Sequence, residues 1–138
     1  MKTAPTEGSQ AGQFTLEIQV QSKDIDELNH VNNVVYLQWV QNVAAAHWNE
    51  LASAEIKAAH VWVALRHEID YVNPAFLGDK VTARTWVSSV EGARSTRHVE
   101  FHTNGKCLAK ATTHWCLLDA TSFKPKRIGP EIRKALEG

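Results

Sequence analysis

The chain has 138 residues, the size of one domain, and folding at this length buries roughly 68% of the unfolded surface. Its 15 basic and 15 acidic side chains cancel, so it lacks the basic surface that steers a protein to nucleic acid or to an anionic membrane. No segment approaches the roughly 18 apolar residues of a membrane span, and the first residues contain no apolar stretch of signal-peptide length. We therefore expect a single cytoplasmic domain with neither nucleic-acid nor membrane partners.

The first part of the chain predicts a tail, a strand and a long helix. Residues 1–12 are rich in Gly, Ser, Thr and Gln without periodicity, which predicts a disordered tail before a domain of residues 13–138. From Phe14 to Val20 apolar and polar residues alternate, as in a strand with one buried face. From Tyr36 to Leu51 apolar residues recur at steps of three and four, which predicts a helix. Asn32 or Asn33 can cap its first turn. The predicted buried face is Tyr36, Val40, Val43, Ala44, His47 and Leu51.

The rest of the chain predicts a second helical turn, four strands and a short terminal helix. The turn falls between Ser53 and His60, and Pro130 is placed to begin the last helix. Asn104 and Gly105 predict a tight hairpin, since both tolerate the positive φ of a type I′ turn. The four predicted strands are 61–72, 78–90, 94–103 and 107–118. This order favours an α+β domain with one helix covered by an antiparallel sheet, although an α+β domain of another architecture remains open.

The segment DIDELNHVNNVVYLQW, residues 24–39, resembles the D-x-D-x-x-x-H-V-N-N-x-x-Y stretch of the hotdog-fold thioesterases. These include the 4-hydroxybenzoyl-CoA thioesterase superfamily and, for HVNN, the plant acyl-ACP thioesterases. RHEIDYVNPAFLGDKV, residues 66–81, is similar to the second and third strands of that family. The resemblance implies the hotdog fold, a long central helix wrapped by a five- or six-stranded antiparallel sheet. It also implies a homodimer or a dimer of dimers, with the active site at the dimer interface and an acyl-CoA or acyl-ACP substrate.

The resemblance assigns catalytic roles to residues around the helix start. Asp26 matches the second Asp of the motif, which acts as general base or nucleophile, and Asp24 is its rival. His30 matches the motif histidine and would contact the thioester carbonyl or orient Asp26. The backbone N–H of Asn33 would bind the thioester oxygen, because a helix N-terminus favours negative charge. Glu68 falls near the second acidic residue of the plant enzymes, and a solvent-facing strand residue is the alternative interpretation.

The remaining expectations concern substrate binding and cofactors. A neutral protein must gather local cations for the phosphates of coenzyme A, although the cations after the last strand are also typical of a solvated chain end. The predicted substrate-binding residues are Asn32, Tyr36, Arg94, Lys124 and Lys126. The histidines and cysteines form no metal-binding motif, so we expect neither a metal nor another cofactor.

Hydrolysis of an acyl thioester is the function that the motif favours. Two alternatives stay open: a hotdog hydratase or dehydratase, and a hotdog protein that binds acyl thioesters without catalysis. The sequence does not specify the acyl group, since several arrangements of side chains along the helix would shape the acyl pocket.

Overall fold

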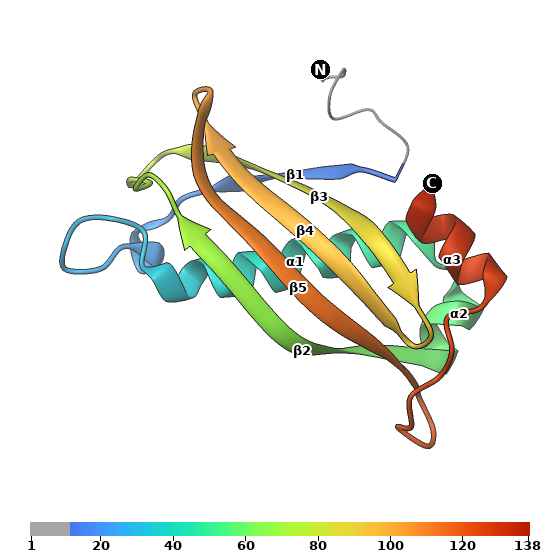
Figure 1. The fold of residues 1–138 in the computed structure, drawn as a ribbon. Coiled ribbons are helices and arrows are strands. Elements are labelled where there is room, and N and C mark those ends of the chain that lie inside the picture. Colours follow the sequence, from blue (N-terminus) through green and yellow to red (C-terminus); the bar gives the residue numbers. More distant parts are fainter. Residues whose placement is uncertain (1–11) are drawn as a thin grey trace.

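The computed structural model describes residues 12–138, so the predicted tail lies outside the described residues, apart from Gly12. Five antiparallel strands form one sheet in the order β1-β3-β4-β5-β2, and a long helix lies across it (Figure 1). The strands are β1 (Phe14–Gln19), β2 (His60–Tyr71), β3 (Lys80–Glu91), β4 (Arg94–Thr103) and β5 (Lys106–Asp119). The helices are the 3₁₀ turn η2 (Ser22–Asp24), α1 (Asn33–Leu51), α2 (Ala54–Ala59) and α3 (Pro130–Glu137). The predicted five-stranded form of the α+β fold is confirmed, and η2 is the one element not predicted.

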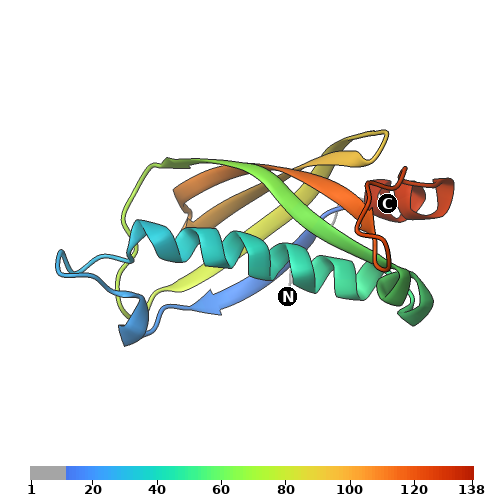
Figure 2. The ribbon, with the colours of Figure 1, turned by 90° about the horizontal axis from the view of Figure 1, so that it is seen from below.

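The sheet curves around α1, which lies in its concave side (Figure 2). Alternation along the strands places one set of side chains against the helix. Phe101 of β4 and Val81 of β3 are fully buried there, together with Val40 of α1. The helix buries Trp39 as well, a residue outside the predicted face, whereas Leu51 is only half-buried. The curved sheet covers α1 on more than one side, so a single stripe of residues underestimates its buried surface.

The hairpin between β4 and β5 has the predicted geometry. Asn104 and Gly105 have φ angles of 49° and 74°. Both values are positive, as a type I′ turn requires. The short connection brings β4 and β5 together in antiparallel register, which shifts once, between Phe101 and His102.

A second apolar cluster closes the sheet at the C-terminal end of α1. It joins the α3 residues Ile132 and Leu136 to Leu117 of β5 and Val90 of β3. Figure 1 shows α2 and α3 at this end, while the loop before α1 extends from the opposite end. Each end of α1 therefore has its own surroundings.

The two edges of the sheet are β1 and β2. β2 is 12 residues long and carries exposed apolar side chains at Val63 and Leu65. None of the helices within residues 12–138 is long and apolar enough to cross a membrane.

Candidate active site

The loop between η2 and α1 is a tight, hydrogen-bonded turn. Ile25 and Val31 form an antiparallel bridge at its base. Above the bridge, the Asp26 N–H donates to the His30 carbonyl at 2.9 Å, and the Asn29 N–H donates to the Asp26 carbonyl at 3.0 Å. Asn29 has a φ of 64°, a left-handed conformation that Asn tolerates better than most residues. The DIDELNH sequence therefore folds back on itself and positions Asp26 beside His30.

The two carboxylates of this segment have different surroundings. Asp24 is 8% exposed, and its Oδ2 accepts the Gln21 N–H at 2.9 Å, which closes the η2 turn. Asp26 is half-buried, and its Oδ1 accepts the Leu28 N–H at 2.9 Å. Within the described chain no hydrogen bond reaches Oδ2 of Asp26. Asp24 thus stabilises a turn, while Asp26 keeps one carboxylate oxygen available.

The start of α1 lies next to this loop. The Asn32 side chain caps the helix, its Oδ1 accepting the Val34 N–H at 3.0 Å. The Asn33 N–H is the first of the helix and has no acceptor within it. Tyr71, at the end of β2, donates its hydroxyl to the Asn33 carbonyl at 3.0 Å. The end of β2 is therefore tied to the start of α1.

These groups meet in a cavity of about 390 Å³. It is lined by Asp26, Leu28, His30, Val31, Asn32, Asn33, Tyr36, Tyr71, Val72, Asn73 and Pro74. Five of the residues predicted for the site are thus brought together: Asp26, His30, Asn32, Asn33 and Tyr36. The His30 ring packs edge-on against Phe76, with ring centroids 5.3 Å apart, so its orientation is restrained.

Aromatic rings form the inner wall of the cavity. Tyr36 is buried and lies edge-on to Trp39, Tyr71 and Phe101, with centroid distances of 5.1, 5.5 and 5.4 Å. Burial, with smaller contributions from Tyr71 and Asp79, raises the pKa of Tyr36 to about 12. The Tyr36 hydroxyl therefore stays protonated at neutral pH and offers a neutral group to a substrate.

Glu68 is not brought to this cavity. It lies on β2, pairs with Arg66 at 3.2 Å and lines a different cavity of about 220 Å³ together with Trp86 and His98. Glu68 and its neighbour His67 point to opposite faces of the sheet. His67 is half-buried, and its Nδ1 forms a hydrogen bond with Oγ1 of the buried Thr113. Within one chain Glu68 does not line the Asp26 cavity.

The predicted cations lie at the far end of the sheet from Asp26 (Figure 1). Arg94 begins β4, and the Lys126 N–H donates to the Leu117 carbonyl in the same region. Lys126 forms an ion pair of 4.0 Å with Asp119, and Lys124 is exposed. Arg94, Lys124 and Lys126 therefore do not contact the Asp26 cavity of their own chain.

Comparison with known proteins identifies the family. The model of a family described as "thioesterase-like superfamily" matches residues 20–136. The chain belongs to the thioesterase-like superfamily. The long-chain acyl-CoA thioesterase FadM of Escherichia coli is 25% identical over 128 residues, which cover 88% of this chain and 95% of FadM.

Solved structures confirm the hotdog fold of this thioesterase. A Thermus thermophilus thioesterase complexed with coenzyme A and Zn has a TM-score of 0.81 and 23% identity, covering 95% of this chain and 94% of the other. A 1,4-dihydroxy-2-naphthoyl-CoA thioesterase from Synechocystis has a TM-score of 0.78 and 20% identity, covering 90% of this chain and 95% of the other. The predicted fold is thus confirmed, and the family match together with the likeness to FadM confirms the predicted enzyme class, a thioester hydrolase.

Two of the lining residues that sequence reasoning missed make polar contacts that shape the cavity. Tyr71 and Asn73 follow one another closely at the end of β2, before Pro74. Tyr71 bonds the start of α1, and the Asn73 amide donates to the Cys107 carbonyl at 2.7 Å. Both contacts join residues more than 30 positions apart. No local pattern indicates such contacts, so only the tertiary structure reveals them.

Proposed function

We propose that this thioesterase hydrolyses acyl-CoA at the cavity between the Asp26 loop and the start of α1, with Asp26 as general base or nucleophile. The observation that supports this role is the contrast between two neighbouring carboxylates: Asp24 is bonded within a turn, and Asp26 lines the cavity with a free oxygen. The names of FadM and of the coenzyme A complex support coenzyme A as the thiol carrier.

Either role of Asp26 gives a balanced reaction. As a general base, Oδ2 takes a proton from water while the water oxygen attacks the thioester carbonyl carbon, and the thiolate leaves with a proton. As a nucleophile, Oδ2 attacks the same carbon and expels the thiolate, and water then hydrolyses the mixed anhydride. The Leu28 N–H on Oδ1 orients the carboxylate in both cases.

The start of α1 is placed to stabilise the negative charge that develops on the thioester oxygen. The Asn33 N–H is unpaired within the helix, and the helix dipole adds to its effect. Removing a single donor of this kind from other enzymes costs roughly 10²–10³ in rate. His30, which also lines the cavity, would contact the carbonyl or orient Asp26.

Within the described residues no Lys or Arg lines this cavity, so the single chain offers the coenzyme A phosphates no cation there. A homodimer formed through the β2 edge would bring a partner's surface to the cavity, and Arg94, Lys124 and Lys126 of that partner would then bind the nucleotide. The exposed apolar residues of β2 support this arrangement, because natural sheets cover such edges. A cytoplasmic location remains part of the proposal.

A panel of acyl-CoA substrates, with thiol release followed by a thiol reagent, tests the function. We expect release of coenzyme A from at least one acyl class, starting with long-chain acyl-CoA. Measuring kcat/KM for the same acyl groups attached to acyl carrier protein tests whether that protein, and not coenzyme A, is the preferred thiol carrier. Binding without thiol release would indicate the non-catalytic alternative, and a change in the acyl chain with the thioester intact would indicate a hydratase or dehydratase.

A further inference from the structure

A larger cavity, of about 490 Å³, lies at the C-terminal end of α1. It is lined by Gln41, Ala44, Ala45, Trp48, Asn49, Lys57, His60, Val61, Trp62, Ser95, Arg97, Trp115 and Leu136. Along α1 the position of Ala44 is about 16 Å from that of Asn33, at a rise of about 1.5 Å per residue. The two cavities share no lining residue, so this one is distinct from the catalytic site.

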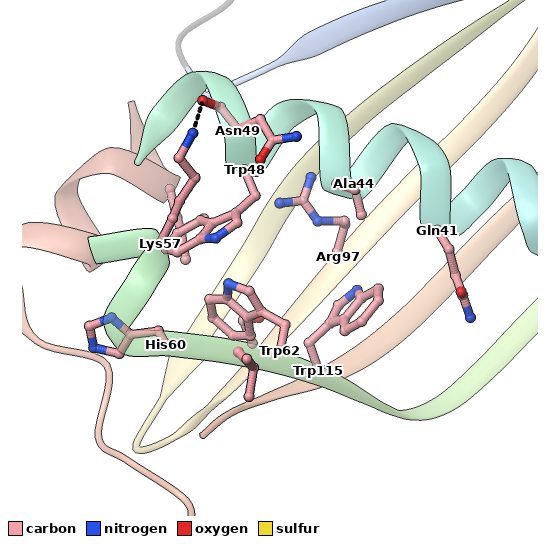
Figure 3. Close-up of a pocket in the computed structure, with 13 residues that line it drawn as sticks. Gln41, Ala44, Trp48, Asn49, Lys57, His60, Trp62, Arg97 and Trp115 are labelled. Carbon is pink, nitrogen blue, oxygen red and sulfur yellow. Dashed lines mark hydrogen bonds between the residues drawn. The ribbon is translucent and has the colours of Figure 1, made fainter. Parts of the chain in front are cut away.

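Arg97 is a buried cation without a counter-ion. Its side chain runs from β4 toward α1 (Figure 3), and the residue is 5% exposed. Nη1 donates to Nδ1 of His47 at 2.9 Å and to Oγ1 of Thr85 at 3.0 Å. Both acceptors are neutral groups, since burial and Arg97 together lower the pKa of His47 to about 4. No carboxylate of residues 12–138 pairs with Arg97, and its Nε and Nη2 donate no hydrogen bond there.

A second donor in the same cavity is also unsatisfied. Nε1 of Trp115 is buried and has no hydrogen-bond partner within the described residues. The cavity lining contains the cations Arg97 and Lys57 but no Asp or Glu. Burying a charge or a donor without a partner is costly, and an anionic acceptor in the cavity would satisfy both groups.

The walls of the cavity define the rest of the ligand. The indole rings of Trp48 and Trp62 meet edge-on with centroids 5.5 Å apart, and Trp115 lies on the same cavity (Figure 3). Ala44 and Leu136 add further apolar surface. A carboxylate fits the planar guanidinium through paired hydrogen bonds, and indole surfaces favour a flat apolar body. The volume lies in the range of small-molecule sites.

We propose that this cavity binds an organic carboxylate whose apolar, flat body lies against the indoles and whose carboxylate accepts hydrogen bonds from Arg97 and Trp115. The site does not depend on the proposed thioesterase mechanism. The carboxylate is either a free acid or the distal end of a long dicarboxylic acyl thioester.

Calorimetry on the full chain, in a buffer without carboxylates, tests the site with phenylacetate and its neutral isostere phenylacetamide. We expect phenylacetate to bind about tenfold more tightly or better, because only the carboxylate supplies the missing charge. Arg97→Met should abolish this difference, and Trp115→Phe should weaken phenylacetate binding about threefold to tenfold through the lost N–H. Equal affinity for the acid and the amide, or no binding of either, would overturn the proposal.

Control variants separate loss of the site from loss of the fold. Lys110→Met removes a cation from the other face of the sheet and should leave phenylacetate binding unchanged. Gln41→Glu adds a carboxylate at the exposed rim of the cavity, where the Gln41 side chain points away from Arg97 (Figure 3), so it should weaken phenylacetate binding only slightly. A loss of affinity as large as that of Arg97→Met would place the carboxylate at this rim and not at Arg97.

Two further arms identify the source of the carboxylate. Glu7 is the one acidic residue of residues 1–11. A clear gain of phenylacetate affinity in Glu7→Gln would mean that the chain supplies its own carboxylate, which overturns the proposal.

Hydrolysis of dodecanedioyl-CoA relative to dodecanoyl-CoA distinguishes the two sources, a free acid and the distal end of a dicarboxylic acyl thioester. If the wild type prefers dodecanedioyl-CoA and Arg97→Met removes this preference, the site binds the distal end of the acyl chain. If Arg97→Met leaves the ratio of the two hydrolysis rates unchanged while calorimetry shows carboxylate-selective binding, the site binds a free acid. Only this arm rests on the proposed function, so calorimetry still decides the site if no hydrolysis occurs.

Discussion

Asp24 and Asp26 carry the same functional group two positions apart, yet the fold gives them different surroundings. Asp24 is buried and bonded to the backbone of η2, and Asp26 lines the cavity beside the helix start. The alternation of the local backbone does not by itself say which of them faces a substrate. Their hydrogen bonds separate the two, so the pair provides an internal control for the catalytic proposal.

Replacing Asp26 by Asn should therefore mainly lower activity, and replacing Asp24 by Asn should mainly lower stability. Asp26→Asn removes the base or nucleophile while keeping the shape, so kcat should fall by roughly 10²–10⁴ with little change in Tm. Asp24→Asn should lower the stability by about 1 kcal/mol through the weakened turn while kcat stays near that of the wild type. Steady-state kinetics and thermal unfolding measure both. Near-full turnover in Asp26→Asn together with an inactive Asp24→Asn would assign the role to Asp24.

His47 gives the fold a pH dependence. Its pKa is lowered to about 4 by burial and by Arg97, whereas an unfolded histidine titrates near 6.5. Between these values the unfolded chain binds a proton that the folded chain does not, so stability is full above about pH 6.5 and falls as the pH falls toward 4. Denaturant unfolding at about pH 7 and about pH 5 should differ by roughly 2 kcal/mol more in the wild type than in His47→Gln. An identical difference in both proteins would mean that His47 titrates normally in the fold.

At the scale of elements, the start of α1 combines a structural task with the catalytic task proposed above. Asn32 caps the helix through the Val34 N–H, and the neighbouring Asn33 N–H is free within the helix. Capping preference follows from local sequence, whereas the exposure of the helix end to a cavity depends on Tyr71 and the β2 end.

Variants of Asn32 can separate these two tasks. Asn32→Ala should cost about 0.5–2 kcal/mol, because the N-terminal cap is lost. Asn32→Asp keeps an acceptor and places a negative charge at the helix N-terminus, so stability should be retained. The same charge opposes the developing oxyanion, and kcat/KM should fall by about tenfold. If Asn32→Asp hydrolyses acyl-CoA as fast as the wild type, the helix end does not stabilise the oxyanion.

At the scale of the whole molecule, the position of β2 at the edge of the sheet is the feature with the largest consequence. β2 exposes the side chains of Val63 and Leu65, and its last residue, Tyr71, lines the Asp26 cavity. An uncovered apolar edge strand favours pairing with a second copy. Closed two-fold symmetry would bury both edges at once.

Light scattering should accordingly give twice the 15.4 kDa of one chain, or a multiple of that dimer. Leu65→Lys introduces a charge on the β2 edge, so it should shift the protein toward the monomer and reduce hydrolysis, because the partner's cations would be lost with the interface. Lys110→Met, an exposed change on β5 and not on an edge strand, serves as the surface control. A monomeric wild type with full activity would refute the shared site.

The sequence by itself determined the elements and the family. Alternation along 14–20 and the later strands, the three- and four-residue spacing from Tyr36 onward, and the Asn104-Gly105 turn all depend on neighbours in the chain. The same is true of the DIDELNHVNN motif, which drew attention to Asp26. Such patterns can be recognised in the sequence because side-chain directions repeat every two residues in a strand and every 3.6 residues in a helix.

Only the tertiary structure decided which side chains meet. It brought Tyr71 to the start of α1, moved Glu68 to a separate cavity and placed Arg94 at the far end of the sheet. It also buried Arg97 beside His47, 50 positions away, where an alternating strand pattern indicates a buried position but not a missing counter-ion. Such contacts depend on strand order and sheet curvature. Neither property can be predicted from the spacing of residues along the chain.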